Sequence, residues 1–377
     1  MKVGIDTFAC DGGSSGVRVY LSEILKRIPP SGDLYELFGW DYDRYAYAEK
    51  APGLEYISRC RFNGATANAF WHIYQYPRFA ENRKYSACFF PAAHKQLPQD
   101  SPCPTVGVVH DLAAHWGKRG VREHLGVIIR MSLPRALRHL DRIIAVSHWV
   151  RQELVSRMGV REAMIEVIPN GIDTAVFHPR PQNEDSVVLI QPFSFSRPYI
   201  LCVSRLDHPV KNHVRLIKAF EIFKERTRFP HRLVLAGSDS HHVDVIKDAA
   251  FLSSFRSDIF FTGHFPAKNL PELYSGADMA VIPSLYEGGG LGVLEAMASG
   301  VPVACSRSAA LPEIADHAAL YFDPENPEDM ADRMVTLATN RDTYLACRKA
   351  GLQRVEAFSW KRCAEETLRV IQETAGR

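Results

Sequence analysis

Short apolar runs rich in valine and isoleucine alternate along this chain with longer stretches of helical period. The runs at residues 2–5, 105–109 and 232–236 each lead into a turn, and an amphipathic stretch follows. This alternation is typical of β-α-β units, in which a helix carries the chain back so that successive strands lie parallel. The sequence therefore predicts an α/β protein.

The alternation is interrupted between residues 179 and 198, where prolines and polar residues crowd and periodicity is lost. A second series of strand and helix patterns then starts at Tyr199. The length of 377 residues suits two domains of about 150 residues each. We therefore predict two doubly wound domains, residues 1–180 and 181–355, which bind ligands at the carboxyl ends of their strands.

Composition excludes several classes of protein. Hydrophobic residues make up 46% of the chain, enough for substantial cores, and the formal net charge of +2 argues against a nucleic-acid partner. The eight cysteines form no C-x-x-C pair and no zinc-spaced cluster, so we expect reduced thiols and no metal site. Neither a secretory leader nor an apolar run of about 18 residues occurs, so we expect a cytoplasmic protein.

The most informative stretch is VIPSLYEGGGLGVLEAMASGVPVACS, residues 281–306, where an apolar strand leads into a glycine loop and then a helix. Gly288, Gly289 and Gly290 let backbone N–H groups approach an anion closely. The positive end of the helix dipole at Leu291 suits a phosphate. We therefore expect a phosphate group at this loop.

Two carboxylates flank the same loop. Glu287 precedes it and can reach a sugar hydroxyl, whereas Glu295 lies one helical turn inside and can accept hydrogen bonds from a ribose diol. A glycine-rich turn with two solvated glutamates is the alternative reading of the same letters.

Two cations follow an earlier strand of the same half. Arg205 and Lys211, in SRLDHPVKN, stand ahead of a helix that we expect Asn212 to cap. Such cations at the carboxyl end of a strand would neutralise a diphosphate, although ordinary surface charges explain them equally well when taken alone. Both groups of residues converge on one pyrophosphate, and this convergence favours a binding site.

The first half offers weaker signals. Gly12, Gly13 and Gly16 follow the first strand but do not form a clean dinucleotide fingerprint, so a phosphate or sugar contact is the better interpretation. His110 ends a later strand, where its imidazole could bind a sugar hydroxyl or a developing charge; a structural role is the alternative.

Two further patterns each have a structural explanation beside a functional one. Asp41 and Asp43 resemble a metal-binding D-x-D, but they follow a short aromatic run, so we expect a solvated loop. Residues 117–142 carry seven Lys/Arg with apolar residues between them, which suits either a solvated face or a helix on anionic lipid.

Together these residues resemble a known family, the retaining glycosyltransferases of family 4. The resemblance covers nearly the whole chain and is densest in YILCVSRLDHPVKNHVRLIKAF, in the stretch from FTGHFPAKN to GVPVACS, and in ALPEIADHAALYFDP. The E-x7-E spacing of the two glutamates fits, and VVHDLA, IIAVSHWVRQEL and VIPNGIDTAVF follow in family order. The resemblance implies a GT-B fold: two Rossmann-like doubly wound domains facing each other across a cleft, with a helix in residues 356–377 crossing back to the first domain.

The resemblance also implies roles for the residues of the second half. Glu295 would hold the ribose and Glu287 the transferred sugar. The diphosphate would be bound by the amides at Gly290 and Leu291 together with Arg205 and Lys211.

Two residues of the first half receive roles in the same way. His110 would face the donor sugar and Gly16 would line the phosphate side. The family usually reads E-G-F-G-L-P, whereas this chain has Gly289 in place of the aromatic residue and Gly292 in place of the proline.

The reaction implied is a metal-independent, retaining transfer of a hexose from a nucleotide-diphosphate sugar, with GDP-mannose slightly favoured over UDP-hexoses and no separate cofactor. The implied acceptor is a glycan or lipid-linked oligosaccharide of bacterial lipopolysaccharide or exopolysaccharide synthesis, with peripheral contact at the inner face of the membrane as a hypothesis. A sugar-nucleotide epimerase and a binding-only protein are the alternatives; a missing fingerprint disfavours an NAD-dependent oxidoreductase.

Overall fold

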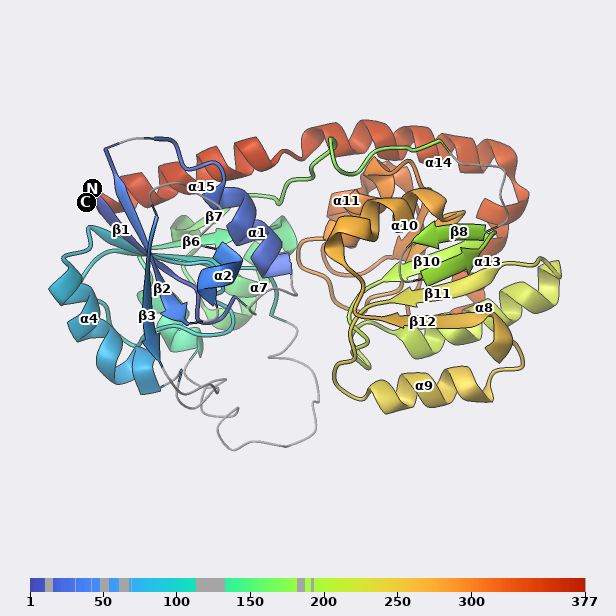
Figure 1. The fold of residues 1–377 in the computed structure, drawn as a ribbon, viewed down its shortest axis with the longest axis horizontal. Helices are drawn as coiled ribbons and strands as arrows, with labels where there is room; N and C mark the ends of the chain where they lie inside the picture. Colours follow the sequence, from blue (N-terminus) through green and yellow to red (C-terminus); the bar gives the residue numbers. More distant parts are fainter. Residues whose placement is uncertain are drawn as a thin grey trace. The chain divides into compact units, whose positions relative to one another are not determined.

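The computed structural model describes residues 1–10, 16–30, 32–41, 43–47, 54–60, 68, 70–112, 133–181, 187–190 and 193–376. The chain divides into two compact units (Figure 1). The first unit combines Met1–Gly171 with Ser359–Arg377, and the second is Ile172–Phe358. The domain bounds expected from the sequence, at 180 and 355, stay predictions.

The first unit is built on a parallel sheet of seven described strands in the order β3-β2-β1-β4-β5-β6-β7. The strands are β1 (Lys2–Asp6), β2 (Leu34–Trp40), β3 (Glu55–Cys60), β4 (Ala87–Phe90), β5 (Thr105–Val109), β6 (Arg142–Ala145) and β7 (Ile165–Val167). Strand β1 lies between β2 and β4, so the direction of winding reverses between β1 and β4.

Helices and helical turns complete this unit. They are α1 (Gly16–Leu25), α2 (Asp43–Tyr47), the π-helical turn η2 (Trp71–Gln75), α4 (Tyr76–Arg83), α7 (His148–Met158), η3 (Glu162–Met164) and α15 (Trp360–Ala375). Ser147 caps α7 by accepting a hydrogen bond from the Val150 amide, and Gly159 ends the helix in the left-handed conformation.

Helix α15 packs against α1 and strands β4, β5 and β6 (Figure 1). Its apolar stripe repeats at helical spacing through Trp360, Leu368 and Ile371, all buried. The Tyr20 hydroxyl of α1 lies 2.9 Å from Thr367 Oγ1, both buried, which fixes the helix laterally. The last residues of the chain are therefore part of the core of its first unit.

The second unit repeats the design with a six-stranded parallel sheet in the order β12-β11-β10-β13-β14-β15. Its strands are β10 (Tyr199–Val203), β11 (Arg232–Ala236), β12 (Ile259–Gly263), β13 (Met279–Ile282), β14 (Val303–Ser306) and β15 (Ala319–Phe322). Its helices and turns are α8 (His213–Thr227), α9 (Val243–Leu252), η4 (Arg256–Asp258), η5 (Ala267–Asn269), α10 (Leu270–Gly276), α11 (Leu291–Ala298), α12 (Leu311–Ala315), η6 (Asp316–Ala318), α13 (Pro327–Thr339), α14 (Arg341–Arg354) and η7 (Val355–Ala357).

One hydrophobic core joins helices and strands of this unit. Leu216, Phe220 and Phe223 of α8 are fully buried at a spacing of four and three residues, and they join one core with Leu233 and Leu235 of β11. Each side chain of this size contributes about 1.5–3 kcal/mol when buried. The predicted α/β class, with two doubly wound Rossmann-like units, is confirmed.

Two local expectations are corrected. The segment 179–198, read as irregular, contains the antiparallel hairpin of β8 (Val187–Ile190) and β9 (Phe193–Ser196). Asn212 precedes α8 but does not cap it; its amide donates to the carbonyls of Pro283 and Pro324 at 3.0 and 2.7 Å instead. The buried Asn212 side chain is thus satisfied by bonds that link its own loop to the loops that contain Pro283 and Pro324.

Candidate functional site

The second unit brings the predicted residues to one edge of its sheet. Strands β10 and β13 are hydrogen-bonded neighbours, although β11 and β12 intervene in sequence. Arg205 and Lys211 follow β10, and Glu287 follows β13. This is the point where the strand order reverses, and ligands of open parallel sheets bind at the carboxyl ends of strands there.

The two loops are joined to each other. The Leu285 amide donates to the Val210 carbonyl at 2.9 Å, and the Asn212 side chain reaches the Pro283 carbonyl. Asn212 is buried, so this link is shielded from water. The loop after β10 therefore sets the position of the loop after β13.

Lys211 and Glu287 form an ion pair across these loops. The Lys211 Nζ lies 2.5 Å from Glu287 Oε2, with the side chains 17% and 25% exposed. The backbone of Glu287 is held as well, because its carbonyl accepts a hydrogen bond from the Ala310 amide at 3.1 Å. A cation and a carboxylate thus stand together at the reversal of the strand order.

The glycine loop ends where helix α11 begins. Gly290 precedes the helix with φ of +58°, in the left-handed region that favours glycine. A Cβ at this position would come within 3.0 Å of the Ile314 side chain. The first turn of α11 leaves the amides of Leu291 and Gly292 without a helical carbonyl to bond, and both residues are partly exposed. Gly289 lies in the partly exposed bend just before.

Glu295 is a residue of α11, and its carboxylate contacts a tyrosine of α10. The Tyr274 hydroxyl of α10 donates to Glu295 Oε2 at 3.0 Å. Burial raises the pKa of Glu295 to about 7, and the hydrogen bond from Tyr274 lowers that pKa only in part. Glu295 is thus a carboxylate poised to change its protonation near neutral pH.

Sequence reasoning missed two residues of this region. Tyr274 reads as an ordinary core position of a helix, and no local signal marks its hydroxyl. His213 is buried with its Nε2 3.0 Å from the Ser204 hydroxyl, and burial, followed by the charge of Lys211, lowers the pKa of His213 to about 3. Arg205, next to Ser204, is exposed.

In the first unit, Gly16 is the exposed first residue of α1, after the first strand of the sheet. Gly12 and Gly13 lie outside the described residues. Gly16 begins the helix that follows β1, and β1 is a strand at which the order of this sheet reverses, where Rossmann-like sheets bind ligands.

His110 follows β5 in an aromatic surrounding. Its ring lies 4.9 Å from the Tyr20 ring and 5.6 Å from the His94 ring, edge to face. Burial, and then the neighbouring His94, lowers the pKa of His110 to about 3. Its Nε2 lies 3.0 Å from the Pro91 carbonyl, so the neutral ring carries its proton on Nε2 and leaves Nδ1 as an acceptor.

The structure describes Asp41 and Asp43 of the D-x-D pattern but only part of the basic segment 117–142. Asp43 is buried and accepts a hydrogen bond from the Thr7 hydroxyl at 3.3 Å, so this residue does not lie in a solvated loop. Among the described residues no cluster of His, Cys, Asp and Glu could hold a metal ion, and no helix is long and apolar enough to cross a bilayer. Of the basic segment 117–142, residues 117–132 lie outside the described part; within the remainder Leu133 and Leu137 are buried.

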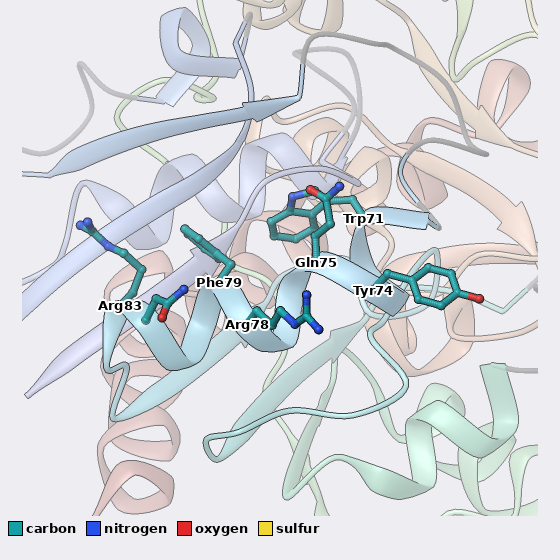
Figure 2. Close-up of a pocket in the computed structure, with 7 residues that line it drawn as sticks. Trp71, Tyr74, Gln75, Arg78, Phe79 and Arg83 are labelled. Carbon is teal, nitrogen blue, oxygen red and sulfur yellow. The ribbon is translucent and has the colours of Figure 1, made fainter.

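A separate hollow of about 330 Å³ lies on η2 and α4 of the first unit. Figure 2 shows its lining side chains, among them Trp71, Gln75 and Arg78, projecting from one continuous stretch of helix. None of the residues predicted for the site lines this hollow.

Two Rossmann-like units are the fold of the GT-B class, and the second unit adds carboxylates, cations and a glycine-preceded helix at the reversal of its sheet. The family comparisons agree. Residues 14–176 match the family model "Glycosyltransferase Family 4", and residues 191–354 match "Glycosyl transferases group 1". Together the two matches cover most of the chain. The chain therefore belongs to the glycosyltransferases that these two models describe.

Several relatives carry curated names. The chain is 31% identical over 238 residues to O-antigen chain mannosyltransferase B of Escherichia coli, covering 63% of this chain and 62% of that protein. It is 28% identical over 275 residues to an MMP α-(1→4)-mannosyltransferase of Mycolicibacterium hassiacum, covering 70% of this chain and 61% of that protein. The chain thus spans about six tenths of these relatives.

Solved structures share the fold over nearly the full chain. Sucrose-phosphate synthase from Thermosynechococcus elongatus superposes with a TM-score of 0.76 at 19% identity, over 99% of this chain and 98% of the other. HepE from Anabaena, solved with UDP and glucose, superposes with a TM-score of 0.75 at 16% identity, over 99% and 100%.

Proposed function

We propose that the protein is a retaining glycosyltransferase that moves a hexose from a nucleotide-diphosphate sugar to a glycan or lipid-linked oligosaccharide. The observation that carries this proposal is the convergence of Lys211, Glu287 and the start of α11 where β10 and β13 meet. The site combines positive charge and backbone amides for a diphosphate with carboxylates for hydroxyl groups.

Each group has a role in holding the donor. The amides of Gly290 and Leu291, with that of Gly292 next in the first turn of α11, bind diphosphate oxygens, because Gly290 brings the backbone close without a side chain in the way. Lys211 and Arg205 neutralise the same oxygens. Glu295 accepts hydrogen bonds from the ribose diol, and Glu287 binds a hydroxyl of the transferred sugar.

The chemical step is a displacement on the face from which the nucleoside diphosphate leaves. The bond from the anomeric carbon to the phosphate oxygen breaks, the acceptor oxygen bonds to that carbon, and the acceptor proton passes to the departing phosphate. The chain contributes charge stabilisation, through Lys211, Arg205 and the first amides of α11. His110 is a neutral ring whose Nδ1 accepts a hydrogen bond from a donor-sugar hydroxyl. Gly16 has no side chain, so it leaves space beside the backbone for the phosphate groups.

We favour mannose as the hexose and GDP as its carrier, with UDP-hexoses as the next candidates. Relatives named as mannosyltransferases support mannose, and one relative from Mycobacterium tuberculosis is named GDP-mannose-dependent. The structural neighbour HepE, with UDP and glucose bound, supports a nucleotide sugar as the donor class.

We propose that the acceptor belongs to bacterial surface-polysaccharide synthesis and that residues 117–142 contact anionic lipid reversibly at the cytoplasmic face. Within the described part, Arg138 and Arg142 donate to the carbonyls of Met158 and Ala163, so the attraction must come mainly from the other cations of the segment. Sedimentation with anionic liposomes tests this. We expect binding at low salt that falls as salt screens the charges; no binding at low salt contradicts it.

The deciding experiment has two stages. Thermal unfolding with UDP, GDP, ADP, TDP or NAD should show stabilisation by one nucleoside diphosphate, of about 2.7 kcal/mol at 100 times its dissociation constant, and none for Glu295→Ala. The matching nucleotide sugar is then incubated with lipid-linked acceptors, with and without EDTA. A glycosylated product of retained configuration supports the proposal; conversion of the donor without an acceptor identifies an epimerase, and binding without conversion identifies a binding protein.

A further inference from the structure

Two cysteines of the first unit lie side by side. Cys88 belongs to β4 and is fully buried, whereas Cys103 lies in the loop before β5 and is partly exposed. Their sulfur atoms are 3.6 Å apart. Adjacent parallel strands bring them together, since Cys88 is opposite Thr105 in the register and its amide donates to the Pro104 carbonyl at 2.8 Å.

We propose that Cys88 and Cys103 are a modification site, a dithiol that oxidants convert reversibly to a disulfide. A disulfide requires the sulfur atoms to approach to about 2.05 Å, a closure of roughly 1.5 Å. Cys103 can supply that movement because it stands in a loop, while Cys88 is fixed by the sheet on both sides.

The two thiols are unequal in a way that suits this chemistry. Hydrogen bonding from Cys88, reinforced by Ser101, lowers the pKa of Cys103 to about 7 against the opposing effect of burial. Burial raises the pKa of the Cys88 thiol well above its ordinary value. Oxidation-sensitive pairs combine an accessible thiolate with a neighbouring resolving thiol in this manner.

The reaction balances with a peroxide as the oxidant. The Cys103 thiolate attacks one peroxide oxygen, the O–O bond breaks, and the products are a sulfenic acid on Cys103 and, after protonation, water. The Cys88 sulfur then attacks the Cys103 sulfur, the S–O bond breaks, and a second water leaves with the Cys88 proton. A thiol reductant reverses the product by exchange.

The loop closed by this bond includes two neighbours of His110. Pro91 supplies the carbonyl that His110 Nε2 faces, and His94 Nδ1 lies 3.5 Å from the His110 amide. A disulfide between residues 88 and 103 restricts the loop that carries both groups. Oxidation is therefore expected to slow amide hydrogen exchange in residues 91–102.

The experiment uses the full chain, hydrogen peroxide and peptide mapping after the remaining thiols are blocked. Lys84, Lys95 and Lys118 place the two cysteines in separate tryptic peptides, residues 85–95 and 96–118. The expected result is an intact mass lower by about 2 Da for the lost hydrogens, with these two peptides linked until a reductant is added. Because the readout is a mass, its outcome is independent of whether the chain transfers sugar.

Matched variants separate the pair from other thiols. Cys103→Ala alters a partly exposed position and should abolish the linked peptides, whereas Cys347→Ser, in the second unit, should leave them unchanged. Cys88→Ser provides the second half of the test if it folds. The proposal is overturned if peroxide gives no linked peptides, or if Cys103 accumulates as a sulfinic acid while Cys88 stays reduced.

Discussion

The ammonium group of Lys211 lies 2.5 Å from a carboxylate oxygen of Glu287, so two side chains from loops 76 residues apart are partners in the folded protein. The proposed function assigns Lys211 to the diphosphate and Glu287 to the sugar. Their contact places those two roles at adjoining points, as a sugar and its phosphate leaving group require. Each side chain also orients the other.

Lys211→Ala should lower kcat/KM by the equivalent of about 2.7–4 kcal/mol, comparable to the loss of a donor to a developing oxyanion. The variant loses charge stabilisation and also leaves Glu287 without this cation. Steady-state kinetics with the nucleotide sugar identified above measures the effect. Lys218→Ala, at an exposed position of α8, is the matched control and should keep wild-type turnover. Full turnover in Lys211→Ala would falsify the role given to this lysine.

Glu295→Gln should change how stability depends on pH. The pKa of Glu295 in the folded protein, about 7, is above its ordinary value of 4.5. Protonated Glu295 therefore contributes stability fully below about pH 4.5, and this contribution is lost as pH rises through about 7. Relative to Glu295→Gln, the wild type should lose on the order of 3 kcal/mol between pH 5 and pH 8. Denaturant unfolding at several pH values measures the difference.

Tyr274→Phe provides the check on that interpretation. It removes the hydrogen bond that lowers the pKa of Glu295, so the pH-dependent loss should move to higher pH. Nucleotide affinity should rise with pH over the same range, because a ribose diol donates best to the ionised carboxylate. Parallel stability curves for wild type and Glu295→Gln would contradict both expectations.

Gly290→Ala and Gly292→Ala should have opposite effects, although the two glycines are two residues apart. Alanine at 290 would have to adopt φ of +58° and approach Ile314 to 3.0 Å, at a cost of about 1–2 kcal/mol for the left-handed backbone alone. Alanine at 292 meets its nearest atom, the Tyr274 hydroxyl, at 3.5 Å, an ordinary contact. It should therefore stabilise the helix by about 0.4–1 kcal/mol. Thermal unfolding of both variants measures this; equal shifts would show that the loop relaxes.

His110→Gln should make the protein less sensitive to acid. The pKa of His110 is lowered to about 3 in the folded protein, so the unfolded chain binds a proton more readily below about pH 6.5. The stability that neutral His110 contributes is therefore lost as pH falls from about 6.5 towards 3. Urea unfolding at pH 7 and pH 4.5 should show a smaller difference for the variant than for the wild type. An unchanged difference would mean that His110 does not stay neutral in the fold.

Several elements of the fold were predictable from local sequence patterns. The strands at 105–109 and 232–236 were predictable from the sequence because buried strands appear as short apolar runs. The hairpin in 187–196 was not, because its segment is broken by prolines and polar residues. The sequence indicated that a helix starts at Asn212. It did not indicate that the Asn212 side chain links loops, because its hydrogen-bond partners are 71 and 112 residues away.

Residue types and their spacing were enough to name the candidate donor site, because a glycine loop, a helix start and flanking charges are local features. Which of those groups touch depended on the sheet: the adjacency of β10 and β13 is a long-range pairing that brings Lys211 to Glu287. The same is true of the pKa of Glu295, set by burial and by Tyr274, and of the approach of Cys88 to Cys103. Charge and chemistry are properties of single residues, whereas proximity and desolvation exist only once distant segments have packed.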